Sequence, residues 1–141
     1  MNYKSKVQYL SRYRDAMRRK RYLSEEVMRL RAEAAGTAKL FSVAPAGSPS
    51  QDRVARAVDK IMDAEAALLR QIGDAEAVRS EVLAVIDREP PRDREILHRR
   101  YLLGQRWERI AEEMHYDVRW VLRCHRRAVE RIDIPEDGNH G

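Results

Sequence analysis

The sequence predicts an all-α protein in two parts, a long coiled-coil-like helical hairpin followed by a module of four shorter helices. Three observations support this class. Six Gly and five Pro in 141 residues are too few for a turn-rich β protein. Apolar residues recur every three or four positions over most of the chain, as they do on one face of an α-helix. One Pro/Gly/Ser-rich stretch and one Glu-Pro-Pro step separate the helical segments.

Residues 3–34 are predicted to form one helix, because their apolar positions have helical spacing and neither Pro nor Gly interrupts them. The basic run Arg18–Arg21 interrupts the row of apolar positions, and we interpret this run as a solvent-exposed face of the helix. The apolar positions are Val7, Leu10, Tyr13, Met17, Leu23, Val27 and Leu30.

Residues 35–51 form a connector in which Leu40, Phe41 and Val43 are expected to fold back onto the helices. A second helix is predicted to begin near Asp52, with a heptad seam along one face. That seam can pair with the first helix as an antiparallel hairpin or with another chain, and the sequence leaves both open. The seam consists of Val54, Val58, Ile61, Glu65, Leu68, Ile72 and Ala75.

The long helical stripes of apolar residues give way to shorter ones near Arg79. This change divides the chain into a hairpin part, residues 1–78, and a module, residues 79–132. The hairpin is expected to serve oligomerisation or partner contact. The module is expected to hold helices over residues 82–86, 92–103, 107–114 and 118–132, with Pro91 starting the second and Gly104 ending it. Residues 133–141 are predicted to be a disordered tail.

Residues 107–126 have the spacing of a helix-turn-helix. Small Ala111 allows the two helices to approach each other, His115 is expected to take a positive φ in the turn, and Asp117 is a good N-cap. The inward positions are predicted to be Ile110, Met114, Val121 and Cys124. The opposite face of the second helix carries Arg119, Arg123, Arg126 and Arg127, a pattern typical of a helix that enters a major groove.

A set of residues in the module follows a known family pattern: Pro90, Pro91, Arg94, Glu95, Leu97, Arg100, Tyr101, Gly104, Trp107, Ile110, Ala111, Glu112, Met114, Arg127, Ala128 and Ile132. This pattern resembles region four of bacterial sigma factors, a four-helix module that reads promoter DNA. The resemblance covers residues 79–132. The chain as a whole resembles small phage and prophage regulators, the ArpU-type and RinA-type late transcription activators. No counterpart of the sigma region that opens promoter DNA is present, so a complete sigma factor is not expected.

The resemblance implies a transcription regulator of phage or prophage genes in the cytoplasm of a bacterial host. Its partners would be double-stranded DNA and host RNA polymerase, with self-association through the N-terminal helices. Because apolar residues stand early in the reading helix, base readout would depend mainly on Arg119 and Arg123. The expected DNA-binding residues are Arg106, Arg109, Val118, Arg119, Trp120, Arg123, Arg126 and Arg127.

Composition and motifs limit the classes of protein to which the chain can belong. A net charge of +5 permits nucleic-acid binding, and the single Cys124 excludes an internal disulfide or a multi-cysteine zinc site. No apolar run approaches the ~20 residues of a membrane helix, and no signal peptide is recognisable. No enzyme activity, cofactor or metal is expected, since no nucleophile–base pair or phosphate loop is visible. Two other functions stay open: a phage small terminase subunit, and a sigma-like module that binds RNA polymerase or another protein instead of DNA.

Overall fold

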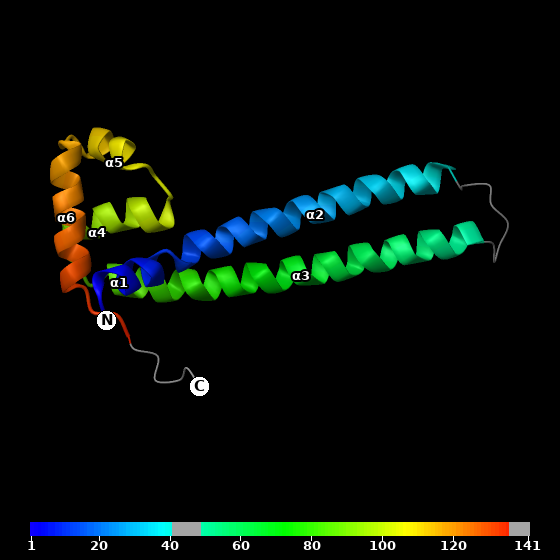
Figure 1. The fold of residues 1–141 in the computed structure, drawn as a ribbon, viewed down its shortest axis with the longest axis horizontal. Coiled ribbons are helices and arrows are strands. Elements are labelled where there is room, and N and C mark those ends of the chain that lie inside the picture. Colours follow the sequence, from blue (N-terminus) through cyan, green and yellow to red (C-terminus); the bar gives the residue numbers. More distant parts are fainter. Residues whose placement is uncertain (41–48, 136–141) are drawn as a thin grey trace. The chain divides into compact units, whose positions relative to one another are not determined.

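The structure is a computed structural model that describes residues 1–40 and 49–135. Helices are the only regular elements of these residues, which confirms the all-α class (Figure 1). None of their helices is long and apolar enough to cross a membrane. In chain order, the elements are α1 (Tyr3–Leu10), α2 (Arg12–Leu40), α3 (Pro49–Ile86), α4 (Pro91–Leu97), the π-helical turn η1 (His98–Leu102), α5 (Trp107–Met114) and α6 (Val118–Arg131).

The chain forms two compact units, and the division differs from the predicted one. The first unit combines Met1–Ala16 with the chain from Glu76 onward, and the second is Met17–Ala75. The sequence pattern placed all of residues 1–78 in the hairpin. The first sixteen residues belong instead to the C-terminal module, because Leu10 is fully buried in a core that the module's helices share.

The predicted helix over residues 3–34 is interrupted once and extends further than expected. α1 ends at Leu10 and α2 runs from Arg12 to Leu40. Ser11 keeps a right-handed conformation (φ −78°, ψ −6°), and its N–H donates to the Val7 carbonyl at 2.9 Å, so the interruption is slight. The predicted connector is shorter, because α2 and α3 take residues from both of its ends. Phe41, Val43 and the side chain of Leu40 lie outside the described residues.

Within the unit Met17–Ala75, α2 and α3 run side by side as a hairpin (Figure 1). An ion pair between Arg31 and Glu65 joins the two helices. The predicted seam on α3 is confirmed except at Val58, which is 46% exposed. The other six positions are buried or half-buried: Val54, Ile61, Glu65, Leu68, Ile72 and Ala75. The packed face of α3 is wider than the predicted seam, because Ala57, Ala64 and Gln71 beside it are also buried or half-buried.

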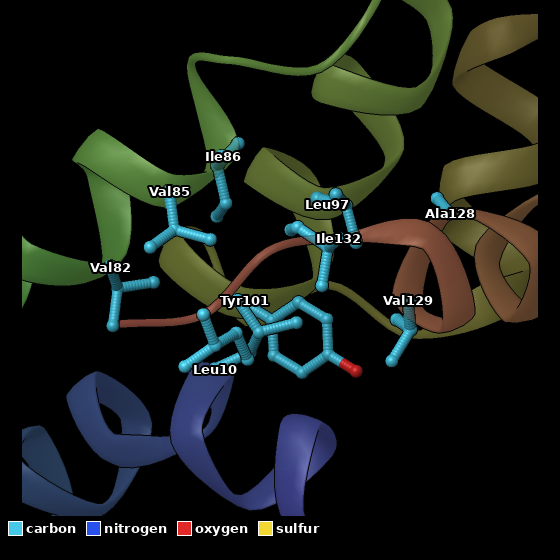
Figure 2. Close-up of a cluster of buried hydrophobic side chains, with 10 residues drawn as sticks. Leu10, Val82, Val85, Ile86, Leu97, Tyr101, Ala128, Val129 and Ile132 are labelled. Atoms are coloured by element: carbon cyan, nitrogen blue, oxygen red, sulfur yellow. The ribbon is translucent and has the colours of Figure 1, made fainter. Parts of the chain in front are cut away.

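The core of the first unit is a cluster of apolar side chains to which most of its helices contribute (Figure 2). Burial of this cluster is what holds the module's helices together. Its members are Leu10 from α1, Val82, Val85 and Ile86 from α3, Leu97 from α4, Tyr101 from η1, Ala128 and Val129 from α6, and Ile132 and Ile134 beyond α6.

The segment after α6 corrects the prediction of a disordered tail over residues 133–141. Ile132 leaves the helix in an extended conformation (φ −60°, ψ 139°), so residues two apart point to the same side. Ile134 therefore joins Ile132 in the core and is only 8% exposed. The chain is packed at least as far as this residue, and residues 136–141 lie outside the described part.

Candidate nucleic-acid interface

The helix-turn-helix formed by α5 and α6 has its own apolar cluster. Ile110 and Ala111 of α5 pack with Val121 and Cys124 of α6 and with Ile96 of α4. All five side chains are at most 3% exposed, and half-buried Met114 packs against them. The predicted inward positions are therefore confirmed. Since α6 buries this face, its orientation on the module is fixed by packing.

The turn between the two helices follows the sequence prediction. His115 adopts the left-handed conformation (φ 61°, ψ 44°), which confirms the expected positive φ. The next N–H, that of Tyr116, donates to the Ala111 carbonyl at 2.9 Å. Asp117 caps α6, and its Oδ1 accepts from the Arg119 N–H at 2.8 Å. Cap and turn together set where α6 begins and the direction in which it leaves α5.

The outward face of α6 is basic. Arg119, Arg123 and Arg127 are exposed and stand four residues apart, which places them in one row along the helix. None of the three pairs with an acidic side chain in residues 1–40 or 49–135. Their side chains can therefore reach an external anion without breaking an internal contact.

Two other predicted contact residues, Arg126 and Arg109, are paired within the molecule. Arg126 Nε donates to Glu130 Oε1 at 3.0 Å, and its guanidinium lies 4.4 Å from the centre of the Tyr3 ring. Arg109 Nε donates to Glu113 Oε1 at 2.9 Å. Exposed ion pairs of this kind contribute about 0–1 kcal/mol, so exchanging them for a phosphate costs little. Arg106, the residue before α5, is also exposed.

The apolar members of the predicted contact set are Val118 and Trp120. Their side chains pack towards the core beneath α6 more than they line its outer face. Both are half-buried and pack against the cluster beneath the helix-turn-helix. The Trp120 ring lies 4.3 Å from the Tyr116 ring, and the Arg92 guanidinium lies 4.9 Å from its centre. Arg92 is thus a basic residue beside the start of α6 that the sequence did not indicate. Its position depends on a tertiary contact between residues far apart, which no spacing rule reveals.

A buried polar pair holds the inner face of α6. His125 is 5% exposed, its Nε2 lies 2.7 Å from the Tyr101 hydroxyl, and the Trp107 ring packs edge-on at 4.6 Å. Burial, with a smaller effect of Arg100, lowers the pKa of His125 to about 4. Burial also raises the pKa of Tyr101. Both groups are therefore neutral at pH 7, and one hydrogen bond joins the Tyr101 hydroxyl to His125 Nε2, with its direction set by the histidine tautomer.

This pair makes the stability of the module depend on pH. The folded state keeps His125 neutral down to about pH 4, whereas an unfolded histidine takes up a proton near pH 6.5. Its contribution is fully present above pH 6.5 and is lost as the pH falls from 6.5 towards 4. This lowering of the pKa corresponds to a loss of about 3 kcal/mol in the free energy of unfolding. Urea unfolding at pH 7.5, 6, 5 and 4.5 measures it.

The control is His125→Gln, whose amide oxygen can accept from Tyr101 but does not titrate. All other titratable groups are common to both proteins, so their contributions cancel in the comparison. The variant is expected to lose less stability than the parent chain between pH 7.5 and 4.5. Parallel loss in the two proteins would show that neutral His125 is not the cause.

An ionic contact holds the C-terminal end of α6. Asp93 of α4 is 4% exposed, and its Oδ2 accepts from Arg131 Nη2 at 2.7 Å. The same guanidinium nitrogen donates to Glu89 Oε1 at 3.0 Å. These contacts raise the pKa of Arg131, with the hydrogen bond to Asp93 as the largest cause. α6 is thus anchored at its capped start, along its inner face and at its last residue.

No protein-family model, curated protein or solved structure matches this chain. The resemblance to sigma region four therefore stays an interpretation of the motif residues in the sequence.

Proposed function

We propose that this chain is a double-stranded-DNA-binding regulator of phage or prophage transcription, and that α6 is the helix that enters the major groove. One observation carries the proposal: a row of exposed arginines stands on the outer face of a helix whose inner face is locked into a core. The motif resemblance supports the same reading.

The dimensions and chemistry of α6 suit this role. The helix has 14 residues and is about 21 Å long, and the major groove is about 12 Å wide and admits an α-helix. Arg119 and Arg123 lie in its first half, the part of a reading helix that reaches base edges. An arginine fork can donate two hydrogen bonds to guanine. Arg127 and Arg106 would contact phosphates and set the register.

A solvated helix face is the plainer explanation, and the spacing of the arginines argues against it. Like charges four residues apart destabilise a helix by about 0.2–0.5 kcal/mol per pair. Arg119, Arg123 and Arg127 form two such pairs, and no acid stands between them in the row. A polyanion on this face would turn the repulsion into attraction, because each guanidinium then neutralises a phosphate.

The proposal includes host RNA polymerase as a second partner, self-association through the N-terminal helices, and action in the bacterial cytoplasm. It assigns no catalytic activity to the chain.

The test is selection of bound fragments from the genome of the source phage or host, at physiological salt, with sequencing of what is retained. We expect enrichment of one or a few promoter-containing upstream regions. Enrichment of a site at the packaging genes would instead indicate a small terminase subunit. Failure to retain any DNA even at low salt would contradict the proposal and favour a protein partner, because phosphate contacts strengthen as salt is removed.

A further inference from the structure

The side of α3 that points away from α2 carries a stripe of uncharged residues. Val58, Met62 and Leu69 are 46%, 61% and 68% exposed, although each is a large apolar side chain. Exposed small residues extend the stripe at helical spacing. The full stripe, here called the α3 outer stripe, is Ala55, Val58, Met62, Ala66, Leu69 and Gly73.

The exposed side of α2, the other helix of the hairpin, has a different composition from the α3 outer stripe. The outer side of α2 carries a row of exposed charged residues at the corresponding spacing, and Tyr22 and Met28 are exposed beside this row. The row consists of Arg18, Arg21, Glu25 and Arg29. Charged residues make up 36% of the chain, yet the α3 outer stripe has none. A Cβ added at Gly73 would meet nothing within 4 Å, so the stripe is open at that end. A continuous exposed surface of apolar and small residues is typical of a protein–protein contact.

We propose that a second copy of the chain docks on the α3 outer stripe, with the two α3 helices antiparallel across a two-fold axis. The stripe is complementary to itself when reversed about a midpoint near residue 64. Met62 then faces the partner's Ala66, so that a long side chain meets a short one. Val58 faces the partner's Leu69, and Ala55 faces the partner's Gly73, which brings the helices close at both ends.

The charges beside the stripe select the antiparallel arrangement. Asp59 and Arg70 are exposed along the same edge, about three turns apart. In an antiparallel pair, Asp59 lies beside the partner's Arg70, and the symmetry makes this contact twice. In a parallel pair the two copies of this edge lie on opposite sides of the contact, so the Asp59–Arg70 contact cannot form. Glu65, at the other edge, is already paired with Arg31 of its own chain.

The size of the stripe predicts a reversible dimer. From Ala55 to Gly73 it extends about 27 Å at 1.5 Å per residue, which makes a narrow contact at the low end of stable interfaces. The inference rests on the proposed self-association and not on DNA binding. It specifies which surface the two copies share and in which direction the helices run.

Sedimentation equilibrium of the full chain without DNA tests it. The apparent mass is expected to rise from 16.5 kDa towards twice that value as concentration increases. Leu69→Glu places a charge opposite the partner's Val58 and is expected to weaken dimerisation at least about tenfold. Met28→Glu is the matched control, because Met28 is 67% exposed on α2 and lies outside the stripe. Circular dichroism verifies that both variants keep their helix content.

A charge exchange tests the direction of the helices. Asp59→Arg and Arg70→Asp are each expected to weaken the dimer, and the double variant is expected to restore it. A parallel pair would show no restoration. A chain that stays at 16.5 kDa at every concentration, or a dimer that Leu69→Glu leaves intact, would overturn the inference. DNA retention is measured on the same variants, so loss of the dimer with DNA binding preserved is distinct from failure of the proposed function.

Discussion

Leu10→Ala is expected to lower the free energy of unfolding of the module by about 2–5 kcal/mol. Leu10 is fully buried in the core shown in Figure 2, although it stands far before the predicted start of the module at Arg79. Removing its side chain forfeits the burial of the lost methyl groups and leaves a cavity that the surrounding helices fill only in part. Chemical denaturation followed by circular dichroism measures the change, and the loss should be visible in tryptophan fluorescence, because both tryptophans lie in the module.

Leu103→Ala is the matched control. It is the same substitution in the same unit, but Leu103 is 58% exposed and its side chain belongs to neither core cluster. Its expected effect is within about 0.5 kcal/mol. Equal effects of the two substitutions would mean that α1 does not contribute to the core in solution.

Arg123→Ala is expected to reduce affinity for the selected DNA site by about 1–3 kcal/mol, which is roughly 5- to 150-fold. Arg123 is exposed in the middle of the basic row and makes no ion pair within the described residues, so nothing inside the protein compensates for its loss. Affinity for unrelated DNA should fall much less, since a phosphate contact elsewhere in the row persists. Fluorescence anisotropy with specific and scrambled duplexes at fixed salt separates the two effects.

Two controls accompany this variant. Arg123→Lys keeps the charge but loses the planar fork, so it should retain general affinity and lose sequence preference. Arg56→Ala removes the same charge from an exposed position on α3 and should leave both affinities nearly unchanged. If Arg123→Ala leaves affinity and preference intact, the docking face assigned to α6 is wrong.

The local features of the helix-turn-helix were the most predictable from sequence. α5 has the predicted bounds, α6 begins at the predicted residue, and the turn and cap geometry of His115 and Asp117 follows the prediction. These features depend on residues within one or two helical turns of each other, where spacing and capping chemistry decide the outcome. The arginine row is predictable for the same reason, because residues four apart on a helix share a face.

The features that the sequence did not indicate all depend on tertiary contacts. Val58 has the right spacing for the hairpin seam, but it is 46% exposed, whereas Ala57 beside it is half-buried. Arg92 reaches the start of α6 only through the ring of Trp120. Arg126 is engaged by Tyr3, which comes from the first helix of the chain. In each case the local sequence is compatible with several different side-chain contacts. Which contact forms depends on how the helices pack together.

α1 and the segment after α6 share one core, which has a consequence for how the chain folds and for which fragments of it can fold. The Lys6 ammonium donates to the Glu130 carbonyl at 2.8 Å across 124 residues of sequence, and Ile134 shares a core with Leu10. During synthesis α1 leaves the ribosome before α3–α6, and its apolar face has no native partner in the core until those helices have emerged. Contacts of such wide sequence separation slow folding and lengthen the exposure of that face to chaperones or to neighbouring chains. An excised fragment of residues 79–132 would lack Leu10 and Ile134, so the smallest stably folded fragment that contains α6 must also include α1 and the segment after α6.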